Sequence, residues 1–223
     1  MKLIDYADRD MLAIDLAQQL AGELTAALMH EERATLIVPG GTTPAPIFDA
    51  LCAADLDWAR VDVMPSDERW VPEDHPRSNG RLIRERLLVG RAAAARFLPL
   101  YATADTPELA LGQLEQVIRP YLPAAVALLG MGEDMHTASL FPDADGLAQA
   151  LAADAPSLVA IRTAAQPEPR VSLSARALRG SLSLHLVITG QAKRDALSVA
   201  RNQPPERAPV ATILENAEIH WAA

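Results

Sequence analysis

Short, continuously apolar runs alternate with amphipathic segments along the chain. Leucine recurs at every fourth position from Leu12 to Leu28, and this spacing predicts a long helix over roughly residues 8–30. The run Ala34–Val38 is apolar and β-branched, which is typical of a buried strand. Further strands are expected at 61–64, 124–129, 158–161, 184–188, 210–214 and 219–221. Further helices are expected around 47–51, 82–88, 106–119 and 193–200.

This alternation predicts an α/β fold with a mostly parallel sheet and helices on both faces, as in Rossmann-like proteins. Residues 1–223 show no internal repeat and no long linker, so we expect a single domain. In such a sheet, ligands bind at the carboxyl ends of the strands. The polar residues that directly follow each strand are therefore the candidates for function.

The composition excludes several classes of protein. The net charge is −9, from 20 Lys and Arg against 29 Asp and Glu, which disfavours a general nucleic-acid or anionic-membrane binder. Cys52 is the only cysteine, which excludes an internal disulfide and indicates a reducing compartment, so we expect a cytoplasmic protein. No signal peptide is visible, and no run approaches the ~20 apolar residues of a membrane span.

The first predicted strand is followed by the turn Gly40-Gly41-Thr42-Thr43. Two glycines let backbone N–H groups approach an anion, two hydroxyls add donors, and the next helix directs its positive N-terminus to the same point. The turn suits a phosphate, and an ordinary tight turn is the alternative. It matches neither a P-loop nor a dinucleotide fingerprint, because no lysine follows and the glycine spacing differs.

The second of these strands leads into the charged stretch Asp67-Glu68-Arg69. Three charges in a row are costly to bury, so they are either solvated or serve a site. Taken alone, the stretch is typical of a solvated loop. Arg69 offers a planar guanidinium that can bind a carboxylate, a phosphate or a developing oxyanion.

The strand expected at 124–129 is followed by Asp134 and His136. A carboxylate near a histidine can orient the ring and fix its tautomer, which leaves the second ring nitrogen free to act as a base. A structural histidine at a helix start is the alternative. The remaining histidines lack comparable neighbours and are expected to be structural or exposed: His30, His75, His185 and His220.

Two further basic residues occupy suggestive places, although each alone is typical of a surface cation. Arg170 follows a proline-rich loop, and Lys193 lies one turn into the helix after Thr189-Gly190. No grouping of Cys, His, Asp and Glu has convincing metal spacing, and no Gly-x-Ser-x-Gly elbow indicates a serine nucleophile. Together the strand ends predict a small phosphorylated substrate and acid–base chemistry with water, without a metal or a redox cofactor.

These segments together resemble the 6-phosphogluconolactonase family. The matching stretches are PGGTTP at 39–44, SDERWVP at 66–72, SN at 78–79, GMGEDMHTASLFP at 130–142, RVSLS at 170–174 and TGQAK at 189–193. They occur in the family's order and span most of the chain, so the set is highly specific although each piece is weak. The resemblance implies a sheet related to that of glucosamine-6-phosphate deaminase. It also implies hydrolysis of 6-phospho-D-glucono-1,5-lactone to 6-phospho-D-gluconate in the oxidative pentose phosphate pathway.

The same resemblance implies a role for each candidate residue. His136 would be the general base, Asp134 would orient it, and Arg69 would stabilise the oxygen that gains negative charge. The substrate and its phosphate would be bound by Gly40, Gly41, Thr42, Thr43, Asp67, Arg170 and Lys193. The expected partner is this small sugar lactone, with no nucleic acid, membrane, metal or cofactor. We expect a monomer or a weak homo-oligomer.

Two residues depart from the pattern of the family. Met135 stands where the family usually has glycine, and a positive φ there would strain it by about 1–2 kcal/mol. Asp134 and His136 would then be slightly displaced and the enzyme slow or specialised, unless the local backbone tolerates a side chain. Arg77 stands where an acidic residue is expected. It is interpreted as a surface charge, with an extra substrate contact as the alternative.

Two other functions fit part of the pattern. A deaminase-like isomerase shares the glycine turn and the Gly-x-Gly-x-Asp-x-His run, but it would carry tyrosine in place of Arg69 and a glutamate-containing segment after the histidine. The segment 137–142 favours the lactonase instead. A non-catalytic sugar-phosphate-binding protein is the third possibility. As part of a regulator it would need a DNA-binding module, and the residues before the first strand form one helix that is not basic.

Overall fold

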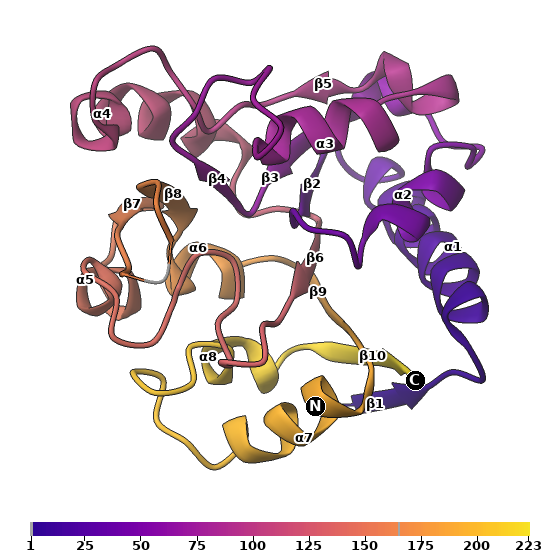
Figure 1. Cartoon of the computed structure of the whole chain (residues 1–223). Coiled ribbons are helices and arrows are strands. Elements are labelled where there is room, and N and C mark those ends of the chain that lie inside the picture. Colours follow the sequence, from indigo (N-terminus) through magenta and orange to yellow (C-terminus); the bar gives the residue numbers. More distant parts are fainter. Residues whose placement is uncertain (1, 165) are drawn as a thin grey trace.

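A parallel sheet of seven strands crosses the centre of the computed structural model, which describes residues 2–164 and 166–223 (Figure 1). The strand order is β1 (Lys2–Asp5), β10 (Glu218–Ala222), β9 (Ser183–Thr189), β6 (Val126–Gly130), β2 (Ala34–Val38), β3 (Val61–Pro65) and β5 (Arg96–Phe97). Strands β2 and β3 are buried along their whole length, which explains why their sequences are apolar apart from Thr35 and Asp62. The predicted α/β class is therefore confirmed.

A second, antiparallel sheet of three strands lies beside the first. Its order is β4 (Asp67–Arg69), β8 (Arg170–Leu173) and β7 (Leu158–Ile161). The sequence predicts β7 but not its place outside the parallel sheet, because an apolar run carries no information about its partner strand. In this small sheet Arg69 lies directly opposite Arg170.

Helices cover both faces of the large sheet and form two separate cores. One core includes side chains of α1 (Arg9–Leu28), α2 (Ala45–Leu51) and α3 (Asn79–Arg86). The other core includes side chains of α4 (Pro107–Ile118), α5 (Leu147–Leu151), α6 (Ala175–Arg179), α7 (Gln191–Ala200) and α8 (Ala211–Leu214). Short 3-10 helices lie at Trp58–Arg60, Gly90–Ala94 and Arg119–Tyr121. No helix of the described residues is long and apolar enough to cross a membrane.

The structure corrects the prediction of a strand at 210–214. Residues Ala211–Leu214 form the helix α8, because a short apolar run between turns does not distinguish a strand from one buried helical turn. The strand β1 is also absent from the sequence-based expectations. It pairs with β10 and brings the two ends of the chain together at one edge of the sheet (Figure 1).

The order of strands changes direction between β6 and β2. The chain adds β3 and β5 on the side of β2, and β9 and β10 on the side of β6. Loops leaving the carboxyl ends of β2 and β6 therefore diverge, which opens a crevice at this point of a parallel sheet. This is where the candidate site lies.

Candidate active site

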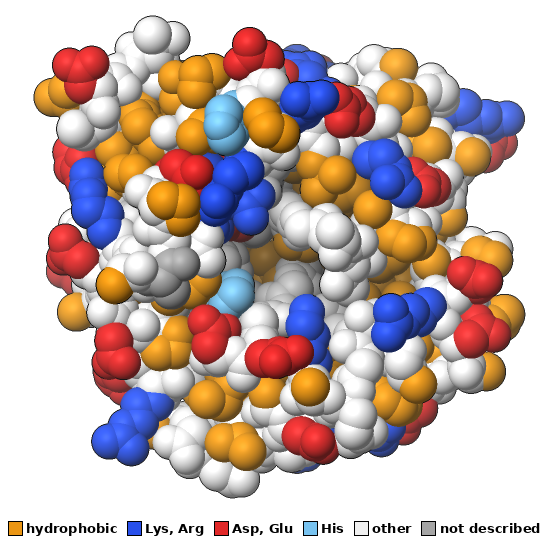
Figure 2. All heavy atoms as spheres, viewed as in Figure 1, with side chains coloured by type: hydrophobic (Ala, Val, Ile, Leu, Met, Phe, Trp, Pro, Cys, Tyr) orange, Lys and Arg blue, Asp and Glu red, His pale blue; other side chains and the backbone are white. Residues whose placement is uncertain are grey.

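A cavity of about 260 Å³ opens at the carboxyl ends of β2, β6 and β9. Every predicted site residue except Asp134 lines it: Gly40, Gly41, Thr42, Thr43, Asp67, Arg69, His136, Arg170 and Lys193. Figure 2 shows this face of the molecule, where Lys and Arg side chains border a hollow above and below and a histidine lies at its rim. Segments far apart in the sequence thus meet in one basic cavity.

The turn after β2 forms one wall of the cavity. Gly41 has a φ of 90°, a left-handed conformation that glycine adopts without strain. A Cβ atom at Gly40 would lie 1.9 Å from the side-chain oxygen of Asn79, so the close approach of the turn and α3 requires glycine there. The packing of the turn against Asn79 leaves Thr42 and Thr43 on the cavity wall.

The charged stretch after β3 is largely buried, so of its two interpretations the solvated loop is wrong. Asp67 and Glu68 are 5% and 3% exposed. The Glu68 carboxylate accepts hydrogen bonds from the backbone N–H of Arg69, from two N–H groups at the start of α3, and from the Ser78 hydroxyl. Burial raises the pKa of Glu68, although these four hydrogen bonds favour its charged form. Donors from α3 therefore replace the water that a charged loop would need.

Arg69 is held at the cavity wall by α3 and the loop before it. Its Nη1 donates to Asn79 Oδ1 at 2.7 Å and to the backbone carbonyl of Arg77 at 2.9 Å. Asn79 is fixed in turn, because its side-chain nitrogen donates to the Asp67 carbonyl at 2.8 Å. A guanidinium anchored in this way keeps a defined direction toward a ligand.

Arg170 lies beside Arg69 and is almost completely buried. Burial lowers the pKa of Arg170, and the nearby charge of Asp67 acts against this effect. Asp67 Oδ2 lies 3.6 Å from Nη1 of Arg170 and accepts a hydrogen bond from Ser139. Arg170 Nη2 donates to Gln166 at 2.8 Å. Two guanidinium groups held side by side make this wall of the cavity suitable for an anionic ligand.

His136 and Asp134 form the pair that their sequence spacing predicts. His136 Nδ1 lies 2.5 Å from Asp134 Oδ1, and the backbone N–H of His136 donates to the same oxygen at 3.2 Å. Burial alone would raise the pKa of Asp134, but the hydrogen bond and charge of His136 lower it overall. The carboxylate therefore stays ionised near neutral pH and occupies Nδ1, so Nε2 is the ring nitrogen left to accept a proton.

The loop around this pair depends on two unusual positions. A Cβ atom at Gly132 would lie 2.3 Å from the His136 ring and 2.4 Å from Asp134 Oδ1, so a side chain does not fit there. Met135 has a φ of 66°, which shows that this position takes the left-handed conformation. Hydrogen bonds nevertheless hold the turn, since Met135 N–H donates to the Gly132 carbonyl and the Met135 carbonyl accepts from Val210.

Lys193 and Arg77 differ in their relation to the cavity. Lys193 lines it from the first turn of α7. Arg77 is not among its lining residues, and it pairs with Glu168 at 3.0 Å and donates to Gln166 at 3.2 Å. Gln166 also binds Arg170, so Arg77 contacts the same supporting residue as a cavity arginine.

The sequence reasoning missed three polar residues that support the site. Asn79 anchors Arg69, while Ser139 and Gln166 contact Arg170. Asn79 and Ser139 lie within stretches that match the family resemblance, which is the only signal they carry. Gln166 lies in a proline-rich loop, and its partner depends on how that loop folds back toward β8.

Comparison with known proteins places the whole chain among relatives of one kind. A family model described as glucosamine-6-phosphate isomerases/6-phosphogluconolactonase matches residues 7–221. A 6-phosphogluconolactonase of Mesorhizobium japonicum is 42% identical over an alignment that covers 97% of this chain and 93% of the relative's length. A 6-phosphogluconolactonase of Pseudomonas aeruginosa is 39% identical over an alignment that covers 92% of this chain and 88% of that relative's length.

Solved structures agree with this result. The crystal structure of a 6-phosphogluconolactonase from Shewanella baltica is 31% identical, has a TM-score of 0.97, and covers 100% of this chain and 98% of its own. The structure of a monomeric glucosamine-6-phosphate deaminase has a TM-score of 0.79 over 100% of this chain and 97% of its own. At 16% identity, the latter shares the fold alone.

Proposed function

The chain belongs to the family of glucosamine-6-phosphate isomerases and 6-phosphogluconolactonases, and from this membership we propose that it hydrolyses 6-phospho-D-glucono-1,5-lactone to 6-phospho-D-gluconate. The observation that carries the proposal is the cavity, which is lined by two arginines, a lysine and a histidine whose ring contacts a carboxylate. These groups suit water activation next to a phosphorylated substrate. Arg69 stands where the isomerase branch would carry tyrosine, which favours the lactonase.

His136 is the general base in this proposal. Its Nε2 takes a proton from water while the water oxygen attacks the lactone carbonyl carbon. Asp134 holds Nδ1 in the correct tautomer and stabilises the imidazolium that forms. A positioned base of this kind contributes typically ~10²–10⁴-fold to the rate.

Arg69 stabilises the negative charge on the former carbonyl oxygen of the tetrahedral intermediate. When the bond between the carbonyl carbon and the ring oxygen breaks, the imidazolium of His136 returns its proton to that ring oxygen. The ring oxygen becomes a hydroxyl, and the new carboxylic acid loses one proton to solvent. One water is consumed, and the enzyme returns to its starting state.

The phosphate is bound by Thr42, Thr43, Arg170 and Lys193. The two arginines have different hydrogen-bond partners. Arg69 donates to Asn79, whereas Arg170 donates to Gln166 and Ser139. The two neighbouring guanidinium groups can therefore serve different parts of one substrate. This division of roles explains how an acidic protein binds a phosphate dianion.

The test is a lactone hydrolysis assay with His136→Ala. The lactone is generated in situ from glucose 6-phosphate by its dehydrogenase, and its loss is followed against the spontaneous background. Wild-type protein should exceed the background and release no ammonia from glucosamine 6-phosphate. His136→Ala should lower kcat by about 10²–10⁴-fold while binding of 6-phosphogluconate stays nearly intact. His30→Ala, which changes an exposed histidine, is the matched control.

Other results would change the assignment in defined ways. Ammonia release without lactone hydrolysis would identify a deaminase. Neither activity, with 6-phosphogluconate still bound, would identify a binding protein. If His136→Ala abolishes binding as well, His136 is a binding residue and the base lies elsewhere.

A further inference from the structure

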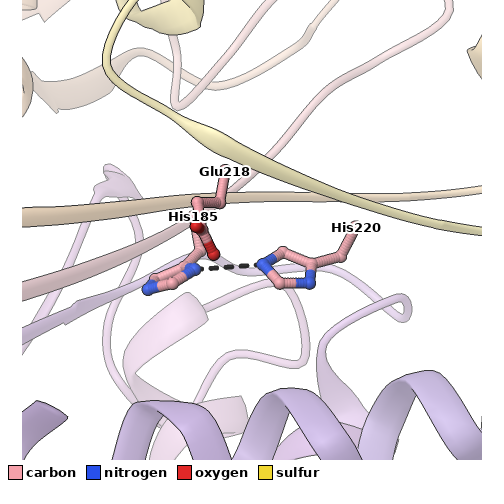
Figure 3. Close-up of side chains that lie close together, drawn as sticks. All are labelled: His185, Glu218 and His220. Carbon is pink, nitrogen blue, oxygen red and sulfur yellow. Dashed lines mark hydrogen bonds between the residues drawn. The ribbon is translucent and has the colours of Figure 1, made fainter. Parts of the chain in front are cut away.

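A second cluster of titratable side chains lies on the face of the sheet that α1 covers (Figure 3). It consists of His185 on β9 and of Glu218 and His220 on β10. Glu218 lies opposite His185 in the strand register, and His220 follows two residues later, so all three side chains leave the same face. None of the three lines the cavity described above.

We propose that His185, Glu218 and His220 bind a divalent transition-metal ion, with zinc as the preferred ion. One candidate ligand atom from each residue lies within 4.8 Å of the others. His185 Nδ1 and His220 Nε2 are 3.0 Å apart. Two nitrogens bound to tetrahedral zinc at about 2.0–2.1 Å are separated by roughly 3.3 Å, so the rings need to move apart by only a few tenths of an ångström.

The other nitrogen of each ring already has a partner suited to a metal site. His185 Nε2 lies 2.8 Å from a carboxylate oxygen of Glu23 on α1. His220 Nδ1 lies 2.9 Å from the Tyr6 hydroxyl. A carboxylate on the outer nitrogen orients a ligating histidine and raises the basicity of its inner nitrogen.

Both rings can offer a lone pair without any change in charge. When His185 donates from Nε2 to Glu23, its Nδ1 is free to accept or to bind a metal. When the Tyr6 hydroxyl accepts from His220 Nδ1, the Nε2 of His220 is also free. With His185 protonated on Nε2, the hydrogen bond between the two rings requires a proton on His220 Nε2. For metal binding this proton moves to His220 Nδ1, the hydrogen bond to Tyr6 reverses because a hydroxyl both donates and accepts, and the metal takes the place of the hydrogen bond between the rings.

The charges around the cluster also favour a cation. Both histidines are fully buried, and the carboxylates of Glu23 and Glu218 lie next to them. Lys2 lies 3.0 Å from Glu218 but is largely exposed. Two nitrogens and one carboxylate oxygen are the donor set that zinc accepts, with a water as fourth ligand.

The experiment is a cobalt and zinc titration of the full, metal-stripped chain. We expect one Co²⁺ per chain with the visible absorption of tetrahedral cobalt, displacement of cobalt by Zn²⁺, and a higher thermal midpoint with zinc. Glu218→Gln should abolish the tetrahedral spectrum. Glu23→Gln should weaken affinity by about 10–100-fold. Glu32→Gln, which changes an exposed carboxylate, is the matched control and should bind normally.

Three outcomes would overturn the proposal. The first is the absence of stoichiometric Co²⁺ or Zn²⁺ binding by the folded protein. The second is unchanged metal binding by Glu218→Gln. The Glu218 side chain is partly exposed, so this variant is expected to fold, and circular dichroism checks that it does. The third is loss of binding in His136→Asn, which would place the metal at the catalytic pair instead.

Discussion

Met135 holds a left-handed backbone conformation between the two residues of the proposed catalytic pair. This conformation costs a non-glycine residue about 1–2 kcal/mol, and Met135→Gly removes that cost. The methionine side chain also packs against the core, so its loss offsets the gain. We expect the free energy of unfolding to change by less than about 1 kcal/mol, and kcat to stay equal or rise. Urea unfolding and lactone kinetics measure both, and a strong loss of kcat would show a separate role for the methionine side chain.

Gly130 ends β6 and Gly132 lies in the loop that follows, and the two offer a pair of substitutions. A Cβ atom at Gly132 would collide with both His136 and Asp134, whereas one at Gly130 meets nothing within 4 Å. A displacement of about 1 Å in a catalytic group can cost ~10²-fold in rate. Gly132→Ala should therefore lower kcat by about this factor. Gly130 lines the cavity, so Gly130→Ala is expected to change KM through contact with the substrate, while its kcat stays near that of wild type. Equal kcat values for the two variants would contradict the geometry of the pair.

At the scale of single residues, the sequence predicts which side chains line the cavity better than it predicts which residues hold those side chains in place. His136, Arg69 and Lys193 follow strands of one parallel sheet, and the shared edge of that sheet brings them into one cavity. Asn79 could not be predicted in the same way, because its contact with Arg69 depends on how α3 packs against the glycine turn.

At the scale of elements, an ion pair connects α4 to the end of β7. Both Nη atoms of Arg162 donate to the Glu108 carboxylate, and these hydrogen bonds lower the pKa of Glu108 to about 2 from 4.5. The folded-state pKa lies below the unfolded one, so the stabilisation is present above pH 4.5 and is lost as the pH falls toward 2. Both side chains are partly exposed, so solvent screening limits the contribution to about 1 kcal/mol or less.

Glu108→Gln tests this connection. The variant should be less stable than wild type at pH 7, and the difference should shrink as the pH falls from 4.5 toward 2. Urea unfolding at a series of pH values measures it. A stability difference that stays constant down to pH 2.5 would show that the effect does not arise from the ionised carboxylate.

Elements differ in how well the sequence predicts them. The buried strands β2, β6 and β9 of the large sheet are predicted because most of their residues are apolar and many are β-branched or leucine. The helix α1 is predicted because its leucines follow the helical period. The strand β4 is missed because it is built from Asp67, Glu68 and Arg69. Its charges are neutralised or hydrogen-bonded by α3 and β8, which lie 10 or more residues away in the sequence and become neighbours only in the fold. The helix α8 is missed because one buried turn has the same apolar pattern as a strand.

At the scale of the whole molecule, the net charge and the charge of the cavity have opposite signs. The chain carries −9, yet Arg69, Arg170 and Lys193 line the cavity. A phosphate dianion is therefore repelled by the protein as a whole and attracted only at short range. At physiological ionic strength charges are screened beyond about 8 Å, which weakens the distant repulsion more than the contacts inside the cavity.

Lys193 is the cavity cation whose removal disturbs the fold least, because it lies on the surface-facing first turn of α7 rather than in a buried network. We place it on the phosphate, a group that does not react. Lys193→Ala should therefore raise KM more than it lowers kcat. The KM of wild type should rise with added salt, and the KM of the variant should rise less, because one of the screened contacts is gone. Lys2→Ala, which changes an exposed lysine outside the cavity, is the control. A loss confined to kcat would instead place Lys193 at the reacting carbonyl.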